Sequence, residues 1–151
     1  MIRSTCVMTV LLALSAAVPT NLAAQESRRY IDARMAGDTT VPPFSGGVLV
    51  GNTFYLAGKI GLTPDRKVPG TPEEEARLVL DDVKATLEKA GMSMDDLVSV
   101  QVFCSDVRHY DAFNRVYRTY FKKEFPARAF LGSGTLLFGA RFEVQAIAVR
   151  R

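Results

Sequence analysis

Residues 71–91, TPEEEARLVLDDVKATLEKAG, contain the strongest local signal in the sequence. Thr71 is suited to cap a helix, Pro72 suits its first position, and Glu74 stands three residues after the cap, as in a capping box. Gly91 closes the segment, where a helix C-terminus often needs a left-handed residue. Apolar residues recur between these signals at helical spacing: Ala76, Val79, Leu80, Val83, Leu87 and Ala90. The segment therefore predicts an amphipathic helix that packs against a core.

Segments typical of strands flank this helix on both sides. They are β-prone or alternate apolar with polar side chains, as half-buried strands do. Gly51-Asn52 separates the first two and favours a tight hairpin turn. Gly58 interrupts the second, which indicates a β-bulge or a close approach of the backbone to a ligand. The expected strands are residues 48–50, 53–57, 97–104, 127–132 and 140–149, and a second helix is expected over about 110–121.

The order of these elements, ββ-α-β-α-ββ, predicts an α+β domain: a single mixed β-sheet with both helices on one face. The second face of such a sheet also needs a cover. We expect Phe54, Phe103 and Phe142 to contribute to that face, so that water alone does not cover it. Self-association is the simplest cover, and the chain is therefore expected to form an oligomer.

The N-terminal segment differs in character from the rest. It carries one charge, Arg3, followed by an apolar run over 7–18 and small residues that end at Ala24. The apolar run is shorter than the roughly 20 residues that span a bilayer. This layout is typical of a secretory signal peptide. A membrane anchor, or a misassigned start of a cytosolic protein, remains an open alternative.

Residues 1–24 are accordingly predicted to be a signal peptide, 25–41 a polar N-terminal tail and 42–151 the folded domain. The predicted location is secreted or periplasmic, with no stable membrane insertion after cleavage. Loss of Arg3 leaves 18 basic against 16 acidic residues, a net charge of +2 instead of +3. So mild a charge argues against a nucleic acid partner.

Cysteine and histidine usage limits the chemistry further. Cys6 leaves with the signal peptide, so the mature chain keeps only Cys104, which is expected to be buried and cannot form an internal disulfide. The one histidine, His109, has no Cys or His neighbour at metal-binding spacing and is expected at the surface or at a helix start. No metal and no cofactor are expected.

Two charged residues interrupt apolar strands. Arg128 lies in Pro-Ala-Arg-Ala-Phe-Leu, residues 126–131, and Glu143 lies in the last strand. A charge in a central strand must be paired or must face a wet cavity. Arginine suits the bidentate capture of a carboxylate, and glutamate can orient or deprotonate a water. The pattern alone leaves two interpretations open. In the first, the two residues are structural, either as an ion pair between adjacent strands or as solvent-facing charges on a sheet edge. In the second, they form a functional site.

Beyond this pattern, segments covering about residues 42–151 resemble the RidA/YjgF family of reactive-intermediate deaminases. The more specific part of this resemblance is the Pro-Ala-Arg motif followed by a glutamate in the last strand. The arginine and the glutamate are about 15 residues apart. The segments that carry the resemblance are 43–45, 50–52 and 57–60 for the opening hairpin, 102–106 and 113–117 for the middle strand and second helix, and 125–128 and 142–148 for the C-terminal signature.

The resemblance implies a homotrimer with clefts between neighbouring subunits. In the deaminase members such a cleft hydrolyses reactive enamine or imine acids to 2-oxo acids and ammonia. Arg128 is then expected to bind the substrate carboxylate and Glu143 to hold the attacking water. Asn114 and the backbone of Gly58 are expected at or near the cleft. The expected partner is thus a small 2-imino or 2-oxo acid.

The chain departs from the founding deaminases at four positions near the expected cleft. Phe44 replaces a tyrosine, Ala57 a serine and Phe130 a cysteine, while Lys59 replaces a glutamine. Phe44, Ala57 and Phe130 are expected to contact the substrate, and the bulk of Phe130 narrows or reshapes the cleft. Because Arg128 and Glu143 are kept, the chain is still predicted to be a hydrolase that acts on C–N bonds. A non-catalytic protein that binds small carboxylates is the alternative, and ribonuclease activity, reported for some members, agrees least with the weak net charge.

Overall fold

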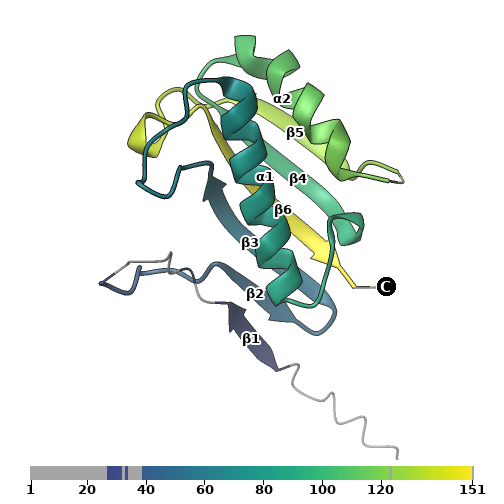
Figure 1. Cartoon of the computed structure of the whole chain (residues 1–151). Helices are drawn as coiled ribbons and strands as arrows, with labels where there is room; N and C mark the ends of the chain where they lie inside the picture. Colours follow the sequence, from purple (N-terminus) through teal and green to yellow (C-terminus); the bar gives the residue numbers. More distant parts are fainter. Residues whose placement is uncertain (1–26, 32, 34–38, 123, 151) are drawn as a thin grey trace, which may run out of the picture.

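The computed structural model describes residues 27–31, 33, 39–122 and 124–150, so the predicted signal peptide lies outside the described residues. These residues form one sheet with two helices against it (Figure 1). The elements are β1 (Arg28–Ile31), β2 (Gly47–Val50), β3 (Thr53–Ile60), α1 (Pro72–Lys89), β4 (Leu97–Cys104), α2 (Tyr110–Tyr117), β5 (Ala127–Gly132) and β6 (Phe142–Val149), with short 3₁₀ turns between several of them.

The strand order across the sheet is β1-β2-β3-β6-β4-β5. Neighbouring strands run antiparallel except β4 and β5, which are parallel, so the sheet is mixed. Helices α1 and α2 lie on the same face and contact each other (Figure 1). The prediction of an α+β domain with both helices on one face is therefore confirmed.

Helix α1 forms as its sequence predicts. The Thr71 hydroxyl accepts a hydrogen bond from the Glu74 backbone N–H, and the Glu74 carboxylate accepts one from the Thr71 N–H. This reciprocal pair satisfies donors that a helix start otherwise leaves open. Gly91 follows the helix with a φ of 76°, a left-handed conformation that glycine adopts without strain. The apolar stripe of α1 is buried against the sheet.

Glu75 is buried beside that stripe although it carries a charge. Its side chain is fully enclosed, and its carboxylate accepts hydrogen bonds from the backbone N–H groups of Arg141 at 2.6 Å and Phe142 at 3.0 Å. The Arg141 guanidinium adds an ion pair at 2.8 Å. Because a buried carboxylate is tolerated only when it is paired and hydrogen-bonded, these contacts hold the first turns of α1 to the start of β6.

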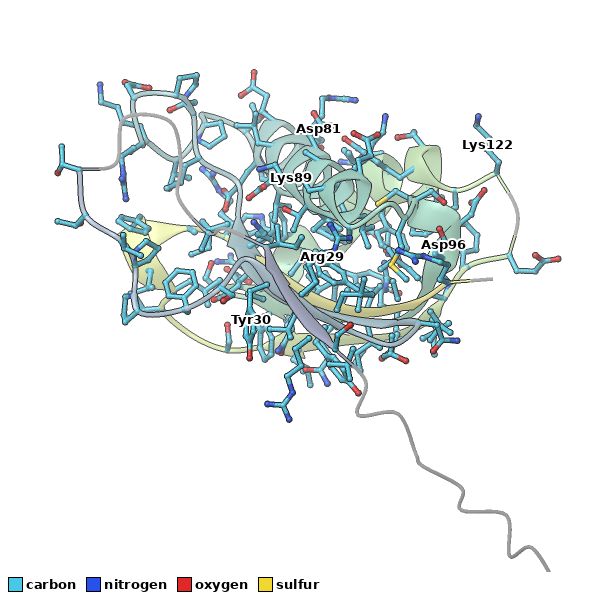
Figure 2. The ribbon with its side chains drawn as sticks, turned by 90° about the horizontal axis from the view of Figure 1, so that it is seen from below. Arg29, Tyr30, Asp81, Lys89, Asp96 and Lys122 are labelled. Atoms are coloured by element: carbon cyan, nitrogen blue, oxygen red, sulfur yellow. The ribbon has the colours of Figure 1, made fainter. Side chains whose placement is uncertain are left out.

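Strand β1 corrects the prediction that residues 25–41 are only a polar tail. Arg28–Ile31 pairs with β2, and Ile31 is buried. The Arg29 guanidinium donates hydrogen bonds to the carbonyls of Lys89 and Ala90 at the end of α1. Figure 2 shows Arg29 on the helix side of β1 and Tyr30 on the opposite side. Arg29 thus contacts the C-terminal end of α1, where a positive charge is favourable.

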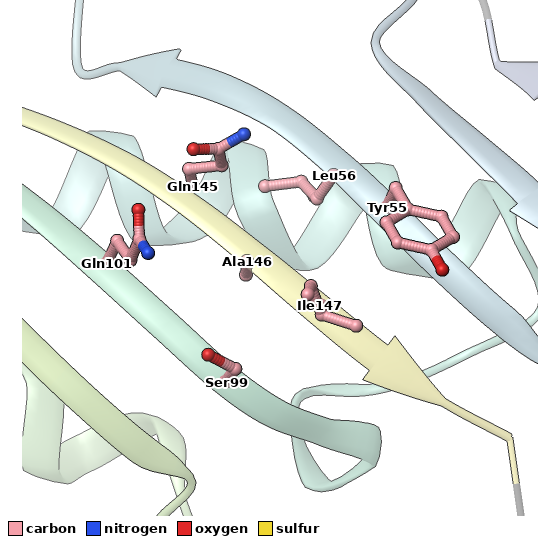
Figure 3. Close-up of a pocket in the computed structure, with 7 residues that line it drawn as sticks. All are labelled: Tyr55, Leu56, Ser99, Gln101, Gln145, Ala146 and Ile147. Atoms are coloured by element: carbon pink, nitrogen blue, oxygen red, sulfur yellow. The ribbon is translucent and has the colours of Figure 1, made fainter.

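The face of the sheet away from the helices is open in the single chain. Figure 3 looks onto it, with the helices behind the strands, and shows the side chains that line a cavity there. The cavity has a volume of about 170 Å³. Phe103 faces this side, as expected. Phe54 and Phe142 do not, because both are fully buried in the core beneath the helices. The cavity is lined mainly by polar or amphipathic side chains: Tyr55, Ser99, Gln101 and Gln145, together with Leu56, Ala146 and Ile147.

Cys104 is buried, as predicted, and burial raises the pKa of its thiol. His109 precedes α2 and meets the Phe142 ring edge-on at 6.2 Å between centroids.

Within the described ranges no group of three or more His, Cys, Asp or Glu side chains could hold a metal ion. Nor is any helix of the described chain long and apolar enough to cross a membrane.

Gly61, directly after β3, allows a test of how closely α1 packs on the sheet. A Cβ there would lie 2.3 Å from the Glu75 carbonyl oxygen and 2.9 Å from the Val79 backbone nitrogen. Gly61→Ala must therefore push α1 away from the sheet, and we expect the free energy of unfolding to fall by about 1–3 kcal/mol. Urea denaturation measures this change.

Gly70→Ala is the matched control, because the nearest atom to its added Cβ is 3.9 Å away, at the Glu74 carboxylate. It should change the free energy of unfolding by less than about 0.5 kcal/mol. Equal stabilities of the two variants would contradict the tight packing of α1 on Gly61.

Candidate functional site

Arg128 occupies β5 at the edge of the sheet and faces α2. Its register partner on β4 is Val100, which is buried beneath the helices, so the two side chains share that face. The guanidinium carbon lies 4.6 Å from the centre of the Tyr117 ring. The rings of Tyr110, Phe113 and Phe130 surround it at 5.8–6.0 Å. Four aromatic rings thus hold this cation by cation–π attraction.

No described residue accepts a hydrogen bond from the Arg128 guanidinium, and no described carboxylate pairs with it. The aromatic rings attract its charge but leave its five N–H donors unused. Arg128 also lines a cavity of about 250 Å³ between the end of α2 and the start of β5. An oriented, unpaired guanidinium at a cavity is a binding group for a carboxylate. The other lining residues are Asn114, Tyr117, Arg118, Phe125 and Pro126.

The structure therefore brings three predicted site residues together: Arg128, Asn114 and Phe130. Tyr117 belongs with them, although its spacing in the sequence predicts only a core position on the second helix. Its hydroxyl is buried without a hydrogen-bond partner in the described chain. Burial raises the pKa of Tyr117 to about 12, against an opposing effect of the Arg128 charge, so the phenol stays protonated at neutral pH. The sequence signal for it is that Asn114, Tyr117 and Arg118 lie at i, i+3 and i+4 on one helix face.

Gly58 and Glu143 form a second cluster, on the open face. The β3–β6 register shifts between Leu56 and Lys59, so Gly58 lies in a β-bulge, as its place in the strand predicts. A Cβ on Gly58 would fall 1.9 Å from Oε1 of Glu143. The carboxylate therefore lies directly over the glycine backbone, in space that only a residue without a side chain leaves free.

The two remaining predicted residues, Ala57 and Phe44, lie in and before the first hairpin of the sheet. Ala57 immediately precedes the bulge, is half-buried, and its N–H donates to the Gly46 carbonyl at 3.2 Å. Phe44 lies in the segment that leads into β2 and is 60% exposed. Neither contacts the cavity at Arg128.

The two clusters are separated within one chain. Glu143 pairs with Phe103 of β4, whereas Arg128 pairs with Val100, so their side chains leave opposite faces of the sheet. Strand β4 also lies between β5 and β6. Two strand spacings amount to about 10 Å, and the register adds about 10 Å along the strands. The interpretation of Arg128 and Glu143 as an ion pair between adjacent strands is therefore wrong.

Comparison with known proteins agrees with this fold. The family model described as Endoribonuclease L-PSP matches residues 37–150. A goat protein named 2-iminobutanoate/2-iminopropanoate deaminase is 37% identical over 125 residues, which cover 82% of this chain and 90% of the relative. The human protein of the same name is 35% identical over 112 residues, which cover 73% of this chain and 82% of the human protein.

Solved structures show the same architecture. The YjgF gene product of Escherichia coli has a TM-score of 0.70 and 32% identity, covering 81% of this chain and 94% of that one. E. coli TdcF with bound serine has a TM-score of 0.73 and 28% identity, covering 82% and 100%. A single sheet with both helices on one face is the architecture that this chain shares with these solved structures. The chain belongs to the RidA/YjgF family.

Gly58→Ala tests the close approach in the second cluster. The clash is with the far end of a flexible side chain, so the Glu143 carboxylate can swing away at small cost. We expect the free energy of unfolding to change by less than about 1 kcal/mol, while a crystal structure shows the carboxylate displaced from the bulge. A loss of stability as large as that of Gly61→Ala, or an unmoved carboxylate, would contradict the geometry.

Proposed function

We propose that this protein hydrolyses reactive enamine or imine acids to 2-oxo acids and ammonia, in clefts between the subunits of a homotrimer. The observation that carries the proposal is the unpaired Arg128 guanidinium, held by four aromatic rings beside a cavity. The names of the goat and human relatives support the substrate class. The serine bound to E. coli TdcF supports it as well, since serine also carries a carboxylate next to a substituted carbon.

In this proposal Arg128 binds the substrate carboxylate through two parallel N–H···O bonds. The aromatic rings fix the guanidinium before the substrate arrives, so little side-chain entropy is lost on binding. Asn114, which lines the same cavity, supplies amide donors and an acceptor beside the imine. The substrate is thereby oriented, and because imines already hydrolyse readily in water, orientation supplies much of the required acceleration.

Glu143 supplies the proton transfers. Its carboxylate accepts a proton from water while the water oxygen bonds to the imine carbon, and Glu143 passes this proton to the imine nitrogen as the C=N double bond becomes single. Glu143 then accepts the proton of the new hydroxyl group as the C=O bond forms, and it delivers that proton to the nitrogen as the C–N bond breaks and ammonia leaves. The backbone of Gly58 lies against this carboxylate and keeps it in place.

The assembly follows from the separation of the two clusters. One chain carries Arg128 on the helix face at the β5 edge and Glu143 on the open face near β3. A cleft that holds both groups must therefore combine β5 and α2 of one copy with the β3 bulge and β6 of a neighbour. A cyclic trimer repeats this heterologous contact three times and closes on itself. It also covers the open face that Figure 3 shows.

The predicted signal peptide adds a location to the proposal. We propose that the protein acts outside the cytoplasm, secreted or in a periplasm. Imines made by cytosolic dehydratases would not reach it there. An oxidase that produces imines from amino acids in the same compartment is the class of enzyme that would supply the substrate.

A non-catalytic carboxylate-binding protein is the second candidate, and one observation favours it. Phe44, Ala57 and Phe130 lack the hydroxyl and thiol groups that the founding deaminases carry at these positions. Such a protein would keep Arg128 as a binding group without turnover. Thermal stabilisation by 2-oxo acids with no hydrolysis of imines would support this second candidate.

The decisive assay generates 2-iminopropanoate from alanine with an amino-acid oxidase and follows its decay. Purified protein should accelerate the decay. Arg128→Ala should lower kcat/KM about tenfold to a hundredfold through loss of the charged hydrogen bonds. Glu143→Gln should lower kcat by about a hundredfold, because the amide cannot accept the proton from water.

Arg115→Gln serves as the charge control, because Arg115 lies on the same helix but pairs with Glu73 outside the cavity. It should leave the rate unchanged. No acceleration by the wild-type protein, or equal acceleration by Arg128→Ala, contradicts the proposed function. Circular dichroism of each variant confirms that it is folded.

A further inference from the structure

The cavity beside Arg128 contains a second cation. Arg118 lies at the end of α2 and lines the same space of about 250 Å³. No described carboxylate pairs with either arginine, and no described Asp or Glu lines the cavity. The other described groups that line the cavity are neutral: the amide of Asn114, the rings of Tyr117 and Phe125, and Pro126.

Two unpaired guanidinium groups at one cavity have a common physical consequence. Their like charges repel each other. A ligand with one carboxylate compensates one of the two charges. A ligand with two carboxylates compensates both and makes charge-assisted hydrogen bonds at each end.

The apolar part of the cavity lining suits a short carbon chain. Tyr117 is buried, and Phe125 and Pro126 add further apolar surface to the lining. A dicarboxylic acid with a few carbon atoms places apolar groups against these walls and its charges against the arginines. The amide of Asn114 remains free to hydrogen-bond the imine group at C2 of such a ligand.

We infer that the site prefers 2-imino dicarboxylates, the class of compound that an oxidase makes from a dicarboxylic amino acid, over 2-imino monocarboxylates. Arg128 binds the carboxylate next to the imine carbon, and Arg118 binds the carboxylate of the side chain. The reaction is the same hydrolysis, and its products are a 2-oxo dicarboxylate and ammonia. This inference rests on the proposed function and assigns its substrate class.

The test compares two imines made in situ, 2-iminobutanedioate from aspartate and 2-iminopropanoate from alanine. The measured quantity is the ratio of their kcat/KM values. The wild-type protein should favour the dicarboxylate, and Arg118→Gln should lower the ratio about tenfold, the effect of one partly exposed charged hydrogen bond. Arg115→Gln removes the same charge from the same helix outside the cavity and should leave the ratio unchanged.

Three outcomes overturn the inference: a wild-type preference for the monocarboxylate, a ratio that Arg118→Gln does not change, or an equal fall in Arg115→Gln. If Arg118 only stabilises the C-terminal end of α2, its replacement lowers the melting temperature and leaves the ratio as it was. Failure of the proposed function is seen separately, as no turnover of either imine. In that case thermal stabilisation by oxaloacetate compared with pyruvate, in wild type and Arg118→Gln, still decides whether the cavity selects two carboxylates.

Discussion

The constraint on which the structure depends is that both helices cover the same face of a single sheet. Side chains alternate between the faces of a strand, so each functional group is committed to one side by its register. Arg128 falls on the covered face at the β5 edge, and Glu143 falls on the open face beside the β3 bulge. The covered face supplies the aromatic rings that hold Arg128, while the open face leaves Glu143 available to a neighbouring copy.

The same fold keeps both clusters rigid. The buried Glu75 carboxylate holds the start of β6 through the N–H groups of Arg141 and Phe142, and the next residue is Glu143. On the adjacent strand β3, Gly58 leaves room for the Glu143 carboxylate, and Gly61, directly after that strand, lets α1 approach the backbone. The position of the candidate catalytic acid therefore follows from the packing of α1, and the position of Arg128 follows from that of α2. Core packing and candidate site are two consequences of one arrangement.

Much of the fold could be predicted from the sequence because its signals are local. The capping box at Thr71, the turn at Gly51-Asn52 and the bulge at Gly58 each express a backbone preference of a few neighbouring residues. Strand β1 could not be predicted, because Arg29 gains its partners from the end of α1, about 60 residues away in the chain. The prediction that Phe54 and Phe142 lie on the open face is wrong for a related reason. Alternation along a strand shows that its side chains point to two faces, but it does not say which face the helices cover. For the site, the pattern identified Arg128 and Glu143 as unusual, whereas Tyr117 and Arg118 joined the cavity only once α2 was placed against β5.

The central claim is that the site combines Arg128 of one copy with Glu143 of another, and subunit mixing tests it most directly. Arg128→Ala and Glu143→Gln proteins are each prepared, then unfolded together in equal amounts and refolded, with each variant refolded alone as the reference. Among all trimers that assemble at random from the mixture, a cleft between an intact Arg128 and an intact Glu143 forms at about one quarter of the subunit contacts. The account predicts that the mixture regains about one quarter of the wild-type imine hydrolysis. A mixture no more active than its two inactive components would contradict it, because that result requires both groups to act within a single chain.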